Sequence, residues 1–231
     1  MKNQVIQFIK KYKHGIPMLL YAFIYITWFR YLEQKVNMNS EFKVIHMAID
    51  DYIPFCEVFI VPYYLWFVYV VVAIGYLLFT DKTEYWRSYV FLVTGMTIFL
   101  IVSTLWPNGH LLRLDTMPRD NIFTDMVSFL WNSDTPTNLW PSIHVYNSIG
   151  SHIAIIRNKA LSDKKGIRIA SFILAVSIIL ATVFLKQHSV FDMLTAFLMA
   201  AVMYPLVYKY DIVTVVQNSR KRMKNARPQV N

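Results

Sequence analysis

The 231-residue sequence has a single cysteine, Cys56, and only 16% charged residues. One cysteine excludes an intrachain disulfide and gives no information about the redox compartment. The sequence also lacks internal repeats, low-complexity runs and Gly/Ser-rich linkers, so we expect one domain. It has no phosphate-binding Walker loop, no nucleophile-elbow serine and no His-Glu-x-x-His segment. These absences exclude the enzyme classes that those motifs define.

Hydrophobic residues, in contrast, make up 56% of the chain. A bilayer core is roughly 30 Å thick, and about 20 mainly apolar helical residues cross it. We therefore expect an all-α polytopic membrane protein, a bundle of six transmembrane helices. The expected spans are residues 16–32, 58–79, 88–106, 141–156, 167–185 and 190–208. The first and fourth are short and carry Arg30 and His144, which favours positions inside the bundle.

The distribution of charge predicts the topology of this bundle. Residues 1–15, 157–166 and 209–231 hold an excess of Lys and Arg, whereas residues 33–57 and 107–139 are more acidic than basic. The positive-inside rule places the first three segments and both termini in the cytoplasm, and the two acidic connections outside. The basic tail, 209–231, is expected to contact anionic lipid headgroups or to be solvated, and not to bind nucleic acid. We expect an integral protein of a bacterial plasma membrane.

Two polar motifs open expected spans at their outer ends. Pro141-Ser-Ile-His144 begins the fourth span, where free backbone N–H groups and the Ser142 hydroxyl can bind an anion. His188 and Asp192 begin the sixth span at a four-residue spacing, which places them on one helix face. A carboxylate on one imidazole nitrogen leaves the other nitrogen free to attack. His188 is therefore a candidate nucleophile, with His144 as acid and base at the same depth.

These motifs resemble the type 2 phosphatidic acid phosphatase superfamily, particularly its branch near the inositol phosphorylceramide synthases, over residues 106–192. Its Pro-Ser-x-His motif is matched by Pro141, Ser142 and His144, and its His-x-x-x-Asp motif by His188 and Asp192. The resemblance implies an outward active site and a metal-independent, cofactor-free mechanism. In it His188 is phosphorylated and oriented by Asp192, while His144 protonates the leaving group and then activates the acceptor. The substrate implied is a lipid phosphate or diphosphate.

Two cations of the family pattern are missing. In the motif Lys-x6-Arg-Pro, Arg113 matches the arginine, but Trp106 stands at the lysine position and Leu114 at the proline position. Thr182 stands six residues before His188, where the family has an arginine. Fewer cations around the phosphate make transfer to a lipid hydroxyl an alternative to hydrolysis.

Other basic residues could supply the missing charge. Arg113 and Lys186 share the expected depth of the two histidines and would neutralise phosphoryl oxygens. Arg119 and His110 lie in the same expected outer region and could also help. We thus predict Arg113, Ser142, Lys186 and Arg119 as phosphate-binding residues.

Two further functions stay open. His144, His188 and Asp192 are also the ligand types of a zinc hydrolase, although we expect no metal. A bundle that kept the motifs without the cations could bind or transport lipid without catalysis. Each histidine taken singly is more often a satisfied polar residue at a membrane boundary, and the pair in two motifs favours chemistry.

Overall fold

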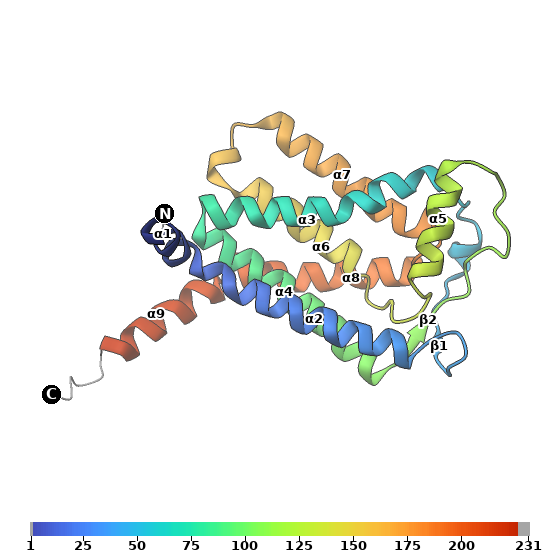
Figure 1. Cartoon of the computed structure of the whole chain (residues 1–231), viewed down its shortest axis with the longest axis horizontal. Coiled ribbons are helices and arrows are strands. Elements are labelled where there is room, and N and C mark those ends of the chain that lie inside the picture. Colours follow the sequence, from blue (N-terminus) through green and yellow to red (C-terminus); the bar gives the residue numbers. More distant parts are fainter. Residues whose placement is uncertain (1, 226–231) are drawn as a thin grey trace.

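The computed structural model describes residues 2–225, which are almost entirely helical, as predicted. Six longer helices run along the molecule (Figure 1): α2 (Ile16–Lys35), α3 (Ile60–Thr80), α4 (Lys82–Leu105), α6 (Ile143–Arg157), α7 (Lys165–Phe184) and α8 (Val190–Tyr204). At one end lie α1 (Lys2–Tyr12) and α9 (Ile212–Asn225), and at the other α5 (Ile122–Ser133) and the strands β1 (Lys43–Val44) and β2 (Asn108–Gly109). Shorter segments are the 3-10 turns Lys13–Gly15, Ala48–Asp51, Glu57–Phe59 and Lys159–Leu161 and the π-helical turn Pro205–Lys209.

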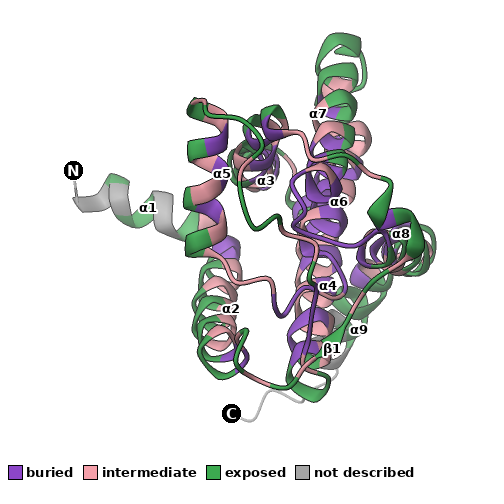
Figure 2. Ribbon diagram, turned by 90° about the vertical axis from the view of Figure 1, so that its right-hand side faces the viewer, coloured by how far each residue is buried: buried purple, intermediate pink, exposed green. Residues whose placement is uncertain are grey.

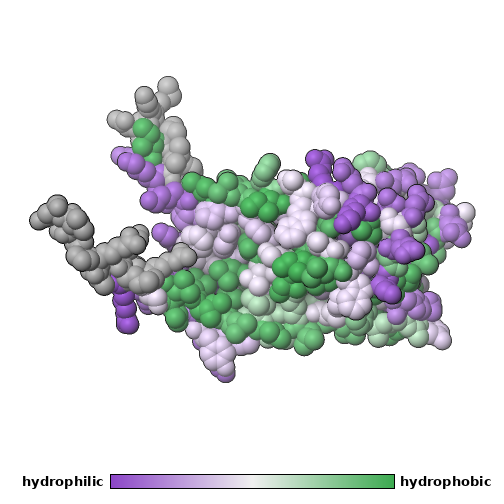
Figure 3. Space-filling model, turned by 90° about the horizontal axis from the view of Figure 1, so that it is seen from below, coloured by the Kyte–Doolittle hydropathy of each residue, from purple (hydrophilic) through white to green (hydrophobic). Residues whose placement is uncertain are grey.

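Five helical stretches in the described part of the chain are long and apolar enough to cross a bilayer: Lys10–Lys35, Glu57–Thr80, Lys82–Leu105, Lys165–Phe184 and Val190–Lys209. Many of their large apolar side chains are exposed, as a lipid-facing surface requires. Figure 3 shows hydrophobic side chains over the middle of one face and hydrophilic ones at its ends. The chain has the helices of an integral membrane protein.

The expected fourth span, residues 141–156, is not among these five stretches. Its helix α6 has 15 residues, a length of about 22 Å, which is short of the roughly 30 Å of a bilayer core. It lies in the centre of the bundle against α3, α4, α7 and α8, and its side chains are mostly buried (Figure 2). Because protein and not lipid surrounds it, α6 can be short and can carry Asn147, Ser148 and Ser151. Six spans are therefore not confirmed.

The start of α4 and the beginning of the basic tail each depend on a local contact that hydropathy does not indicate. Helix α4 begins at Lys82 and not at residue 88, because the Asp81 side chain accepts the N–H groups of Thr83 and Glu84, both at 3.0 Å. In the basic tail, Asp211 forms an ion pair with Arg87 at 2.7 Å just before α9 begins. Residues 226–231 of that tail lie outside the described residues.

The two connections predicted to be acidic and outward pack against each other. Strand β1 pairs in parallel with β2, Lys43 opposite Asn108. The backbone of Gly109 passes so close to Pro136 that a Cβ there would lie 2.6 Å from the Pro136 carbonyl oxygen, so only glycine fits. Together these connections cover the end of the bundle at which α7 ends and α8 begins (Figure 1).

Candidate active site

His144 and His188 come from separate helices, and their rings lie side by side. The ring centroids are 5.6 Å apart, and His188 Nε2 lies 3.4 Å from His144 Nδ1. His188 is in the turn between α7 and α8, and His144 is in the first turn of α6, which packs against both helices. The contact is possible because α6 begins at the end of the bundle where α7 ends.

The other side of the His188 ring faces Asp192. His188 Nδ1 lies 3.3 Å from Asp192 Oδ2, and the same oxygen accepts the Ser189 N–H at 3.0 Å. A carboxylate that takes the Nδ1 proton leaves Nε2 with its lone pair. The hydrogen bond between the rings then comes from His144 Nδ1–H. Asp192, His188 and His144 thus form a hydrogen-bonded chain of one carboxylate and two imidazoles.

The backbone before His188 forms a tight turn that aims this ring. The Thr182 carbonyl accepts the N–H groups of both Gln187 and His188, at 2.9 and 3.0 Å. Lys186 adopts a left-handed conformation, with φ 54°, to close the turn. The Thr182 backbone therefore shapes the turn that carries His188.

Ser142 is the N-cap of α6. Its Oγ accepts the Val145 N–H at 3.4 Å, and its own backbone N–H donates to the Asp192 carbonyl at 3.4 Å. The second contact joins the start of α6 to the first turn of α8. Ser142 therefore joins the start of the helix that carries His144 to the first turn of α8, and its hydroxyl proton is not used by the cap.

Lys186 and Arg119, predicted to bind phosphate, are engaged elsewhere. Lys186 Nζ donates to the carbonyls of Asp50 and Ile53, at 2.8 and 2.7 Å, and burial lowers the pKa of this amine. Arg119 forms an ion pair with Glu57, Nε to Oε1 at 2.6 Å, and its side chain is half exposed. The geometry does not favour either as a phosphate ligand.

Arg113 is held beside the histidine turn. Its NH1 donates to the carbonyls of Trp131 and Asp134, at 2.9 and 2.7 Å, and its NH2 donates to Gln187 Oε1 at 3.1 Å. Burial, and after it the charge of Arg113, lowers the pKa of His188 to about 3. The guanidinium is therefore near enough to act on the site electrostatically.

Aromatic rings enclose His144. Tyr63 stacks on it with centroids 4.8 Å apart, and Trp66 lies at 4.3 Å. Both belong to α3 and are buried. The spacing of this pair in the sequence, i and i+3, does not indicate which ring the two aromatic side chains contact. They hold the imidazole in place.

Sequence reasoning missed Asp50 and Gln187 and misplaced His110. The Asp50 carboxylate accepts Ser189 Oγ, the Val190 N–H and the Met47 N–H, at 2.5, 2.8 and 2.8 Å. His110 is fully buried, with Nε2 3.0 Å from the Gln187 carbonyl, so it supports the turn and is not a free cation. No spacing rule links residues 50 and 110 to a turn at 187.

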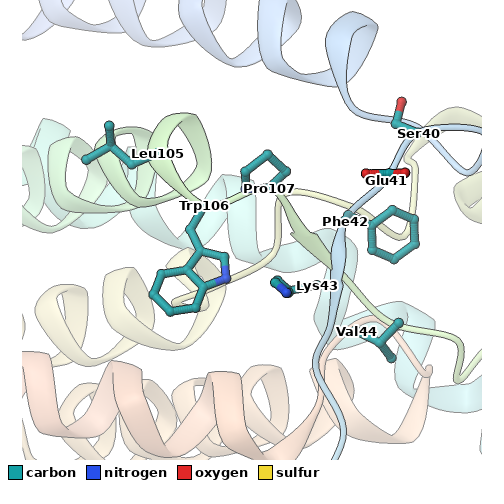
Figure 4. A pocket seen from close by; sticks show the side chains of 8 residues that line it. All are labelled: Ser40, Glu41, Phe42, Lys43, Val44, Leu105, Trp106 and Pro107. Atoms are coloured by element: carbon teal, nitrogen blue, oxygen red, sulfur yellow. The ribbon is translucent and has the colours of Figure 1, made fainter.

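A pocket of about 740 Å³ opens beside β1 and the end of α4, and neither His144 nor His188 is among its lining residues (Figure 4). It is lined by Ser40, Glu41, Phe42, Lys43, Val44, Leu105, Trp106 and Pro107. Trp106, which stands at the lysine position of the pattern that the sequence resembles, borders this pocket, and its ring contacts that of Trp140 with centroids 6.3 Å apart.

The zinc alternative requires three ligands that point to one centre. In the described residues, no group of three or more His, Cys, Asp or Glu side chains could hold a metal ion. The nitrogens of His188 face Asp192 and His144 instead. The donor geometry does not favour a zinc centre.

Two imidazoles are expected to stay neutral across the physiological range. Burial lowers the pKa of His188 to about 3 and that of His110 to about 4. Their protonated forms should appear only below about pH 5, whereas an unfolded histidine takes up its proton near pH 6.5. The unfolded chain therefore binds protons at these two histidines that the folded protein does not bind. As a result, the free energy of unfolding decreases as the pH falls below 6.5. Histidine-labelled NMR spectra should show both rings unchanged between pH 8 and 5, and titration of either near 6.5 would contradict this.

No family model, curated protein or solved structure matched the chain in the comparisons made with it.

Proposed function

We propose that this protein is a membrane lipid-phosphate phosphatase that acts through a phosphohistidine on His188, at the extracytoplasmic face. One observation carries the proposal: the buried His188 ring contacts the Asp192 carboxylate through one nitrogen and the His144 imidazole through the other. A neutral imidazole with a free lone pair is the form that attacks phosphorus.

In the first step His188 Nε2 attacks the phosphorus of the lipid phosphate. The N–P bond forms, the bond from phosphorus to the lipid oxygen breaks, and His144, which takes a proton from the bound phosphate monoanion, gives that proton to the lipid oxygen. Asp192 stabilises the positive charge that develops on the His188 ring. A nitrogen-to-nitrogen distance of 3.4 Å leaves no room for a phosphoryl group, so substrate binding has to part the two rings.

In the second step water attacks the phosphohistidine. His144, now neutral, takes a proton from the water, the O–P bond forms, and the N–P bond breaks. Inorganic phosphate leaves and His188 regains its lone pair. The same residue thus serves as acid and then as base, and the resting state is restored.

The environment of the site supports a lipid substrate. The five apolar helices place the histidine turn at one end of a membrane bundle, where an amphiphile can present its headgroup while its chains stay in lipid. The acidic connections 33–57 and 107–139 lie at this end, which favours the outer side.

Transfer to a lipid hydroxyl is the second candidate, favoured by the placement of the cations. Lys186 and Arg119 are engaged with other groups, which leaves Arg113 of the three predicted cations. A phosphodiester carries one negative charge, whereas a phosphomonoester carries about 1.5 to 2 at neutral pH. A site with one guanidinium suits the diester, whose phosphoryl group would pass from His188 to an acceptor hydroxyl deprotonated by His144.

The proposal predicts a covalent intermediate. Brief incubation of the detergent-purified protein with ³²P-labelled phosphatidate or isoprenyl diphosphate should give an acid-labile, base-stable label that maps to His188. Added ceramide-type alcohols should divert the label into lipid if transfer is the reaction, and inorganic phosphate should appear if hydrolysis is. The absence of both label and turnover with monoesters, diphosphates and diesters alike would refute a phosphohistidine enzyme and favour lipid binding alone.

A further inference from the structure

Two buried N–H groups beside His188 have no hydrogen-bond partner. They are the Nε of Arg113 and the side-chain Nε2 of Gln187. Gln187 is 1% exposed, so water from outside does not reach its amide freely. Most buried donors in native proteins are paired, and an unpaired one is costly. Two such donors at one turn indicate an acceptor that is bound there.

Contacts within the protein fix the orientation of the Gln187 amide. Arg113 NH2 donates to its Oε1 at 3.1 Å, so the carbonyl end faces the guanidinium and the NH2 end is the free one. The backbone is held on both sides, because Gln187 N–H donates to Thr182 and its carbonyl accepts from His110. The free donor is therefore in place before any ligand arrives, as an oxyanion site requires.

Contacts within the protein also fix the orientation of the Arg113 guanidinium. Its NH1 donates to two carbonyls of the segment 131–134, and its plane lies over the Trp131 ring, 5.7 Å from the centroid. Because NH1 and NH2 are engaged, Nε is the Arg113 nitrogen that has no hydrogen-bond partner. Arg113 thus keeps its Nε–H, and Gln187 its side-chain NH2 group, for an external acceptor while the two residues hold each other.

We propose that Arg113 Nε–H and the Gln187 amide N–H bind two oxygens of the phosphoryl group that His188 attacks. This inference rests on the proposed function and deepens it, because it adds to Arg113 a neutral donor, Gln187, at a site where two cations of the family pattern are missing. The site then combines one positive charge with a neutral donor, a set that binds a tetrahedral oxyanion through directed hydrogen bonds. Gln187 is a substrate-binding residue in this scheme.

The test is the substitution Gln187→Glu, measured by binding and not by turnover. Glutamate keeps an oxygen for Arg113 but replaces the free N–H with a charged oxygen that repels phosphate. Orthovanadate and inorganic phosphate are titrated into the full-length protein in detergent by calorimetry. We expect the dissociation constant to rise at least about tenfold, which is the loss of one charge-assisted hydrogen bond. Gln217→Glu, the same change at an exposed position of α9, should leave it unchanged.

Each possible result of this titration either supports or overturns the inference about Gln187. Unchanged affinity in folded Gln187→Glu protein overturns the inference, as does a wild-type protein that binds neither anion. If that variant does not fold, Gln187→Met removes the donor without adding charge, and it should weaken binding by about tenfold. If anion binding depends on Gln187 but His188 takes up no ³²P label, the proposed phosphohistidine is refuted while the proposed oxyanion site is supported.

Discussion

Replacement of His188 by alanine is expected to abolish turnover of lipid phosphates, a loss on the order of 10⁴-fold or more. The substitution removes the attacking nitrogen, and no other group takes its place between Asp192 and His144. Asp192→Asn keeps the shape but can leave the ring in the wrong tautomer, so a loss of about 10²- to 10⁴-fold is expected. Initial rates on a mixed-micelle substrate, with the ³²P label measured in parallel, give both values.

His152→Ala is the matched control for this experiment. His152 is another helix α6 histidine, and its Nδ1 lies 2.9 Å from Ser171 Oγ, away from the His188 turn. Its loss should change turnover by no more than a few-fold. Turnover that survives in His188→Ala protein of normal fold would show that the reaction does not pass through this residue.

Replacement of Asp50 by alanine is expected to lower the free energy of unfolding by about 3–5 kcal/mol. The buried carboxylate accepts three hydrogen bonds, two of them from Ser189 and Val190 at the start of α8. Its removal leaves these donors unpaired in the interior and frees the turn that carries His188. Denaturant unfolding in detergent micelles, followed by tryptophan fluorescence, measures the change.

Asp51→Ala serves as the neighbouring control. The Asp51 side chain is 63% exposed and pairs with His46 on the surface, so its loss should cost no more than about 0.5 kcal/mol. Asp50→Asn keeps one acceptor oxygen, so the free energy of unfolding of this variant should lie between those of the Asp50→Ala and Asp51→Ala proteins. Equal stability of the Asp50→Ala and Asp51→Ala proteins would contradict a clamping role for Asp50. Turnover should fall with Asp50→Ala even below the unfolding temperature, because the start of α8 is no longer held.

Hydropathy predicted the long helices well, because a bilayer demands a length and an apolarity that can be counted along the chain. It also indicated the helix α6, whose short length and polar residues favoured a place inside the bundle, but it did not show whether α6 crosses the bilayer. It also placed the start of α4 too late, because an N-cap at Asp81 and an ion pair between Arg87 and Glu84 stabilise helical residues that a bilayer would not favour.

The candidate site was predictable where neighbours in sequence are neighbours in space. The pairing of His188 with Asp192 follows from a four-residue spacing, and the cap at Ser142 from its place before α6. The partners of Lys186, Arg119 and Arg113 were not predictable, since a long side chain can reach any of several segments. Those segments, around Asp50, Glu57 and Gln187, meet only when the connections fold over the bundle end.

The sequence by itself thus determined the class of the protein, the places of its longest helices and the residues able to do chemistry, because each depends on composition or on spacing within one helix. Only the tertiary structure decided which helices surround α6, that two imidazoles face each other, and which cations and amides lie around them. Contacts between residues far apart in the chain depend on how whole helices pack, and packing is decided by the sum of many weak contacts that no local pattern records.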